Sequence, residues 1–144
     1  MKKIIFLILI SFSSFAQKDK NELTETINTF FEGLNKKDTS LLSRVIHEDC
    51  SLNTVLIKAD NNSELKKEEI ANFLKSIGSI PAGMKIEERI LSIELMQDEA
   101  LASAWVPYEF YVNDKFSHKG TNLITLVKTN DFWKITAIID TRKK

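Results

Sequence analysis

The chain has 144 residues with 20 basic and 20 acidic side chains, so there is no excess of positive charge to bind nucleic acid. This length suits a single domain built around one hydrophobic core. Cys50 is the only cysteine, which excludes an internal disulfide. We expect Cys50 to be a small buried side chain rather than a reactive thiol.

The first residues have the features of a secretory signal peptide. Lys2 and Lys3 precede an apolar run over residues 4–10, and a Ser-x-Ala step ends at Ala16. The run is shorter than the roughly 20 residues that span a bilayer, which favours cleavage after Ala16 over a permanent anchor. We therefore predict a signal peptide at 1–16, a single domain at 17–144, and a periplasmic or secreted protein without a stable membrane anchor. Loss of the two lysines leaves 18 basic against 20 acidic residues, a net charge of −2.

Three segments in the first half have helical periodicity. The first follows a loose polar leader at 17–20, the second begins at Asp38, and the third runs from about Lys67 to Gly78. Asp38 suits a helix start because its carboxylate can accept amide protons of the first turn. The apolar positions of the three segments are Leu23, Ile27, Phe30, Phe31 and Leu34; Leu41, Leu42, Val45 and Ile46; and Ile70, Phe73, Leu74 and Ile77.

Strands dominate the second half of the chain. β-Branched and aromatic residues fill 105–142, and polar turns interrupt them at 113–115 and 129–131. Earlier strands are expected at 51–58 and 85–96, with a short return strand at 63–66. The order of helices and strands predicts an α+β fold in which the helices cover one face of a sheet.

The C-terminal part of the chain contains four motifs: Trp-x-Pro-Tyr-x-Phe-Tyr from Trp105, Phe-Ser-His-x-Gly from Phe116, Trp-Lys-Ile from Trp133 and Asp-Thr-Arg from Asp140. These motifs resemble those of the nuclear-transport-factor-2-like superfamily, and within it the SnoaL-like and lumazine-binding-like proteins. The resemblance implies a cystatin-like roll: a cone-shaped, curved, mostly antiparallel sheet around three helices, with a pocket at the open end and frequently a dimer through the sheet. Relatives include isomerases, dehydratases and cyclases as well as binders that are not enzymes, so the resemblance implies a fold rather than a reaction.

His118 is the first candidate site residue. Strand alternation groups it with Phe116, Gly120 and Ile124, so we expect it to face the core or a pocket. A neutral imidazole there could act as a general acid or base. The alternative is a buried histidine tied to a backbone carbonyl or a carboxylate.

Asp140 is the second candidate. A carboxylate at the end of the last strand, near the pocket mouth, could accept a proton, and burial against aromatic rings would raise its pKa. An ion pair with Arg142, two residues later on the same face, would explain both residues equally well. If Trp133 faces the helices, alternation turns Asp140 inward only where a β-bulge intervenes.

The strand at 100–112 has apolar side chains on both faces. Trp105, Glu109 and Tyr111 share one face, and Tyr108 and Phe110 share the other. We assign the helices as the cover of one face and a second copy of the chain as the cover of the other, which predicts a homodimer through the sheet. Glu109 is either a pocket carboxylate or a rim residue paired with a lysine.

Metal and cofactor sites have little support. His47 to Cys50 are four consecutive potential ligands, which cannot converge on one ion from a regular element. The sequence has no glycine-rich phosphate loop, nucleophile elbow or HExxH motif. We therefore expect no metal and no cofactor.

These patterns favour an exported protein that binds a small apolar or aromatic molecule in an apolar pocket. The residues expected to line it are Trp105, Glu109, Tyr111, His118 and Asp140. One alternative is an isomerase, dehydratase or cyclase that moves a proton next to a carbonyl, with His118 or Asp140 as base. Another is a non-catalytic interaction module that uses the outer surface of the sheet.

Overall fold

A computed structural model describes residues 6–60 and 62–144 of the chain, and these residues form three helices and one seven-stranded sheet. The helices are α1 (Phe6–Lys36), α2 (Thr39–Val45) and α3 (Ile70–Gly78). The strands are β1 (Ile46–Ile57), β2 (Ser63–Glu69), β3 (Ile86–Ile90), β4 (Glu94–Asp98), β5 (Leu101–Val112), β6 (Lys115–Thr129) and β7 (Phe132–Arg142). The predicted α+β class is confirmed.

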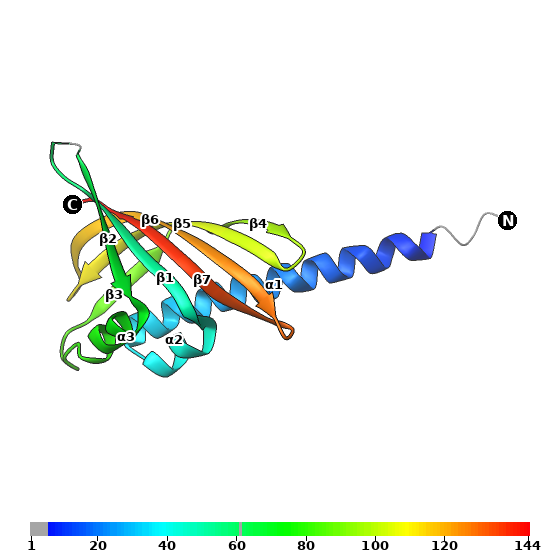
Figure 1. Ribbon diagram of the computed structural model, residues 1–144, viewed down its shortest axis with the longest axis horizontal. Helices are drawn as coiled ribbons and strands as arrows, with labels where there is room; N and C mark the ends of the chain where they lie inside the picture. Colours follow the sequence, from blue (N-terminus) through cyan, green and yellow to red (C-terminus); the bar gives the residue numbers. More distant parts are fainter. Residues whose placement is uncertain (1–5, 61) are drawn as a thin grey trace.

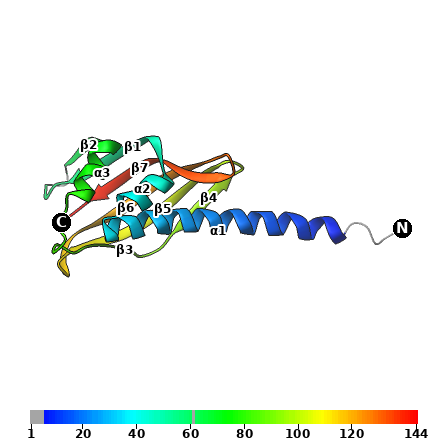
Figure 2. The same cartoon turned by 90° about the horizontal axis from the view of Figure 1, so that it is seen from below.

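The sheet has the order β2-β1-β7-β6-β5-β3, and β4 continues the edge beside β5. Every pairing is antiparallel except that of β1 with β7. The sheet curves around the C-terminal part of α1, with α2 and α3 on the same side (Figure 1). The view from below shows the three helices together against the concave face of the sheet (Figure 2). This arrangement is the cone-shaped, mostly antiparallel roll that the sequence motifs implied.

Helix α1 packs one apolar stripe against the inner face of the sheet. Leu23, Ile27, Phe30, Phe31 and Leu34 are all buried, as their spacing predicts. The carboxylate of Asp38 accepts the amide protons of Ser40 and Leu41 at 2.9 and 3.1 Å, so it caps α2.

The N-terminal part of α1 extends beyond the sheet in both views (Figures 1 and 2). Of the predicted signal peptide, residues 1–5 lie outside the described residues, and residues 6–16 are helical. Residues 17–20 are also helical, so the predicted loose leader is wrong; Lys128 binds Asp19 at 2.6 Å and ties this turn to β6. Among the described residues, no helix is both long enough and apolar enough to span a membrane.

Two-residue turns join the last three strands. Asn113 and Asp114 link β5 to β6, and Asn130 and Asp131 link β6 to β7, all four with positive φ. Such left-handed pairs match the twist of a tight hairpin, and Asn and Asp adopt this conformation more readily than most residues.

Two β-bulges decide which side chains face inward. Phe110 pairs with His118 but Tyr111 pairs with Phe116, which leaves Ser117 as the extra residue on β6. Thr136 is the extra residue on β7 in the same way. As a result Phe116 faces outward while His118 faces inward, and Trp133 and Asp140 are both buried. The predicted grouping of Phe116 with His118 on one face is therefore wrong. The β-bulge at Thr136 is the one that the sequence analysis required if Trp133 and Asp140 were both to face inward.

Candidate functional site

A cavity of about 270 Å³ lies between the inner face of the sheet and helices α1 and α3. One part of its wall is apolar and the other part is polar. The apolar part consists of Phe30, Leu34, Leu52, Phe73, Ile77, Ile80, Ile86 and Phe110. The polar part consists of Thr54, Glu68, Ser76, Glu88, Tyr108, His118, Asn122, Asp140 and Arg142.

The polar part is built by adjacent strands, which position it rigidly. Thr54 on β1 and Asn122 on β6 both pair in register with Asp140 on β7. Tyr108 on β5 and Glu88 on β3 extend the set across the sheet. Asn122 and Asp140 are each only 6% exposed, and they are the buried polar residues of the described chain. Buried polar groups of this kind need hydrogen-bond partners, and each of these five has one.

The Asp140 carboxylate accepts hydrogen bonds on both oxygens. The hydroxyl of Thr54 donates to Oδ1 at 2.5 Å, and the Tyr108 hydroxyl lies 3.1 Å from Oδ2. The Arg142 guanidinium lies 3.7 Å from the same Oδ2, so the predicted ion pair is present. Burial and the negative charges of Asp140 and Glu88 raise the pKa of Tyr108 far above its ordinary value. Tyr108 therefore keeps its hydroxyl proton at neutral pH and acts as a hydrogen-bond donor.

Glu88 is a site residue that the sequence interpretation missed, as it missed Thr54, Tyr108 and Asn122. Its Oε1 accepts a hydrogen bond from the Asn122 side chain at 2.8 Å. Its backbone is fixed by Asn35 of α1, which accepts from the Glu88 amide at 2.7 Å and donates to its carbonyl at 3.2 Å. Burial, together with the negative charge of Asp140, raises the pKa of Glu88 to about 7. The sequence held one sign of this role. Glu88 lies two positions after Ile86 and two before Ile90, so strand alternation places its charge on the same face as these two apolar side chains.

His118 stands in the cavity wall as an aromatic group. Its ring stacks on Phe110 at 4.8 Å and meets the edge of Tyr108 at 5.9 Å. Nδ1 lies 3.0 Å from the hydroxyl of Ser117. Burial, with a smaller effect from the positive charge of Arg142, lowers the pKa of His118 to about 4. A base this weak suits proton transfer at neutral pH less well than a carboxyl group with a pKa of about 7.

Gly120 makes room for the polar part of the wall. A Cβ atom at this position would lie 1.7 Å from the carbonyl oxygen of Thr141 and 3.1 Å from the Tyr108 ring. The Tyr108 hydroxyl lies 3.0 Å from that same carbonyl. The absence of a side chain at Gly120 therefore lets β5, β6 and the end of β7 approach closely enough for Tyr108 to reach Asp140.

The other three predicted site residues lie on the outer face of the sheet and do not line the cavity. Trp105 is 51% exposed. The Tyr111 hydroxyl donates to Glu109 at 2.7 Å, and the Arg89 guanidinium lies 3.9 Å from the centre of the Tyr111 ring. Of the five residues, the structure thus brings only His118 and Asp140 together in the cavity wall.

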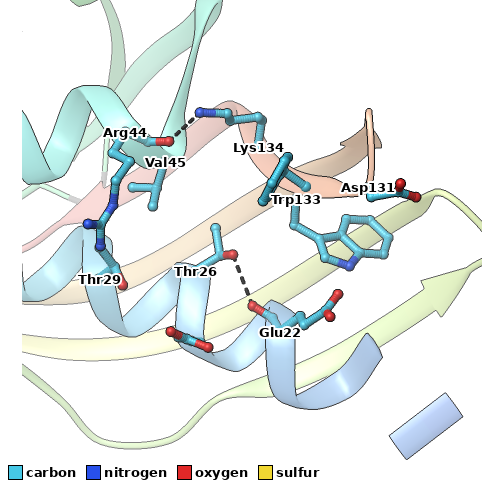
Figure 3. Close-up of a pocket in the computed structure, with 10 residues that line it drawn as sticks. Glu22, Thr26, Thr29, Arg44, Val45, Asp131, Trp133 and Lys134 are labelled. Carbon is cyan, nitrogen blue, oxygen red and sulfur yellow. Dashed lines mark hydrogen bonds between the residues drawn. The ribbon is translucent and has the colours of Figure 1, made fainter. Parts of the chain in front are cut away.

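A second hollow of about 550 Å³ lies near the β6–β7 hairpin, between α1 and the end of α2 (Figure 3). Trp133 forms part of its wall, and the buried indole N–H has no hydrogen-bond partner among the described residues. Charged groups of both signs line it, and Lys134 already binds the carbonyl of Arg44.

Neither cavity contains a set of described side chains that could bind a metal ion. Within residues 6–60 and 62–144, no group of three or more His, Cys, Asp or Glu side chains could hold a metal ion. Burial raises the pKa of Cys50 to about 11, which keeps this side chain a thiol at neutral pH.

A model of the family described as "Putative lumazine-binding" matches residues 18–138. No protein of curated function matches the chain. Among solved structures, an NTF2-like protein with a cystatin-like fold from Novosphingobium aromaticivorans is 15% identical with a TM-score of 0.74, covering 96% of this chain and 91% of that one. An NTF2-like protein of unknown function from Shewanella baltica is 17% identical with a TM-score of 0.63, covering 88% of this chain and 95% of that one. A further NTF2-like protein of unknown function, from Methylobacillus flagellatus, is 18% identical with a TM-score of 0.61, covering 88% and 94%. At these identities the structures support the fold alone.

Proposed function

The chain belongs to the family described as "Putative lumazine-binding", and from this membership and the cavity we propose that it binds a small, largely apolar or aromatic molecule between the sheet and α3. The observation that carries the proposal is the division of the cavity wall. Aliphatic and aromatic side chains from α1, α3 and the sheet form one part, and Glu88, Asn122 and Asp140 converge at the other. An apolar hollow with a few placed polar groups is the usual form of a small-molecule site.

The test is native mass spectrometry of the protein isolated from cells that produce it. We expect an added mass on the wild type that denaturation removes. Ser76→Trp places a large side chain at the exposed edge of the cavity and should remove the added mass. Lys75→Trp adds the same side chain at the preceding position, which is also exposed but does not line the cavity, and should retain the added mass. Retention in both variants would place the bound molecule elsewhere.

The second part of the proposal concerns the cellular location of the protein. A basic start, a short apolar run and the Ser-x-Ala step support export with cleavage after Ala16. Mass measurement of the protein recovered from the periplasm or medium should give a chain that begins at Gln17. A chain that still carries residues 1–16 would contradict export by cleavage.

A homodimer through the outer face of the sheet is the third part. Trp105 pairs in register with Leu123, and Leu123 with Ile139, so the three form one apolar row across β5, β6 and β7. They are 51%, 37% and 41% exposed, which is unusual for a contiguous set of large apolar side chains on a monomer. A second copy of this face would bury the row by self-complementary contact. Sedimentation velocity should give a dimer at micromolar concentration; a monomer at every concentration would contradict it.

Proton transfer next to a carbonyl is a second candidate function, favoured by one observation. Glu88 has a pKa of about 7 inside the cavity, near the operating pH at which a general base works best. Exchange of the hydrogens next to the carbonyl of 1-indanone for deuterium would test it by NMR. Catalysis predicts exchange faster than in buffer and a loss of about 100-fold or more in Glu88→Gln. Equal rates with and without protein would reject the enzyme.

A further inference from the structure

Glu88 is a cavity-facing carboxyl group that lacks a cationic partner. Asn122 binds one of its oxygens, and no lysine or arginine among the described residues forms an ion pair with it. Asp140 differs, because Thr54, Tyr108 and Arg142 all surround its oxygens. The carboxyl group that the protein buries in the cavity wall without an ion-pair partner is therefore that of Glu88, whereas Glu68 is exposed to solvent.

The charged groups around Glu88 do not supply the missing positive charge. Asp140, across the sheet, and Glu68, at the end of β2, are further carboxyl groups in the cavity wall. Arg142 is the one guanidinium in that wall; it pairs with Asp140, and its charge lowers the pKa of Glu88 less than burial raises it. His118, with its pKa lowered to about 4, carries no charge at neutral pH. Tyr108, with its raised pKa, adds none either. Three carboxyl groups thus face a single fixed cation.

We propose that the ligand carries a positive charge, and that it is a primary or secondary ammonium on an apolar or aromatic body with the ammonium bound by Glu88. This inference rests on the proposed small-molecule function and names its ligand class. A carboxylate taken out of water is costly without a counter-charge, so a ligand that brings the counter-charge gains more than a neutral molecule of the same shape. Charge-assisted hydrogen bonds from N–H to a carboxylate are also among the strongest in proteins.

The rest of the cavity suits the body of such a ligand. Phe30 and Phe73 stack with ring centres 6.5 Å apart on the helix side, and Phe110 lies on the sheet side next to His118. Aromatic faces attract cations as well as apolar groups, so they add to the preference for an ammonium compound. An anionic ligand would instead meet the three carboxyl groups of the cavity wall.

The proposal predicts the direction in which the affinity for the ammonium ligand changes with pH. Glu88 must be ionised to bind the ammonium, and half of it is protonated near pH 7 in the free protein. Cation binding therefore displaces a proton, and affinity should rise with pH. The ionised fraction grows about tenfold between pH 6 and pH 8 for a group with this pKa, which sets the expected gain.

Three probes of one shape test the charge directly: 2-phenylethylamine, which is a cation at these pH values, 2-phenylethanol, which is neutral, and phenylacetate, which is an anion. Calorimetric titration of the wild type at pH 8 should give the tightest binding for the amine, by about tenfold or more over the alcohol. At pH 6 this preference should shrink by about tenfold. Amine binding at pH 7 in buffers of different ionisation enthalpy should show proton release, a readout that needs no variant.

Glu88→Gln should abolish the preference for the amine and leave binding of the alcohol within about twofold. The matched control is Glu87→Gln, which removes a carboxylate that pairs with Lys85 and Arg89 and does not line the cavity. It should keep the preference. Equal or tighter binding of the alcohol or phenylacetate, or a preference that survives Glu88→Gln, overturns this inference and leaves the proposed function standing. Failure of all three probes to bind overturns both.

Discussion

Where β5, β6 and β7 border the cavity, the two faces of the sheet have the opposite of the usual polarity, although the rest of their inner face is apolar. Near the open end, the inner face presents Asn122 and Asp140 towards the helices, both nearly fully buried. The outer face presents Trp105, Leu123 and Ile139, all substantially exposed. A stable core alone would favour apolar groups inside and polar groups outside. This reversal is what the two proposals explain: a small molecule would bind at the inner face, and a second copy of the chain would cover the outer face.

Of the variants considered, Gly120→Ala should disrupt the packing of the inner face most strongly. The added Cβ would lie 1.7 Å from the Thr141 carbonyl, so backbone strands must separate and Tyr108 must lose its contact with Asp140. We expect the free energy of unfolding to fall by about 4 kcal/mol or more in chemical denaturation, the range of severe steric changes. Gly83→Ala is the matched control, because a Cβ there meets nothing within 4 Å. Equal stability of the two variants would contradict the close approach.

Glu88→Gln sharpens the comparison because it removes the one uncompensated charge of the inner face. The pKa of Glu88 rises from 4.5 to about 7 on folding, so the folded state binds more protons than the unfolded state between these pH values. The Glu88 carboxyl group therefore contributes to the stability of the wild type fully below about pH 4.5, and this contribution is lost as the pH rises through 7. The variant should be more stable than the wild type by about 3 kcal/mol at pH 8 and nearly equal at pH 4.5. Thermal unfolding at the two pH values measures this, and a variant less stable at pH 8 would argue against a desolvated carboxylate.

Trp105→Lys tests the outer face without touching the cavity. A central aromatic side chain in an interface is worth about 2 kcal/mol or more, and a lysine in both copies adds repulsion. We expect the dimer to weaken by about 30-fold or more in sedimentation equilibrium, with probe binding in the cavity unchanged. Phe132→Lys, which makes a similar change at an exposed aromatic side chain outside this row, is the control and should leave the dimer unchanged. A dimer indifferent to Trp105→Lys would place the interface elsewhere.

His118→Phe gives the smallest effect and the opposite pH dependence. The pKa of His118 falls from 6.5 to about 4 on folding, so its contribution to stability is present above about pH 6.5 and is lost as pH falls towards 4. Because the side chain is only half-buried, we expect about 1 kcal/mol. The variant keeps an aromatic ring against Phe110 and should lose less stability than the wild type between pH 6.5 and 4.5. An unchanged pH profile would contradict the buried neutral imidazole.

The helices, their order and the hairpin turns could be predicted, because periodicity and local chemistry determine them. Asp38 caps α2, and Asn-Asp pairs form both late turns, as their side chains suggest. The overall roll followed from resemblance to known motifs rather than from propensity. His118 and Asp140 were placed in the cavity wall, although the inward direction of Asp140 depends on a bulge at Thr136 that no glycine or proline marks.

The rest of the site could not be read from the sequence for two physical reasons. β5 is apolar on both faces, so alternation separates Trp105 from Tyr108 without telling which of them faces the helices. Glu88 lies in a segment with several charges, and only the fold shows that its neighbours Glu87 and Arg89 pair outside while it faces the cavity. The partnership of Glu88 with Asn122 joins residues 34 positions apart, which local patterns do not report.

The most direct test of the account is the titration of the Glu88 carboxyl carbon by NMR in protein labelled with ¹³C at glutamate. Glu88→Gln assigns the signal. Without ligand we predict a pKa of about 7, and with saturating 2-phenylethylamine a clear fall towards the ordinary value for glutamate. An ordinary pKa in the free protein, or a pKa that stays constant or rises when the amine binds, would contradict the claim that Glu88 is the unpaired charge that selects the ligand.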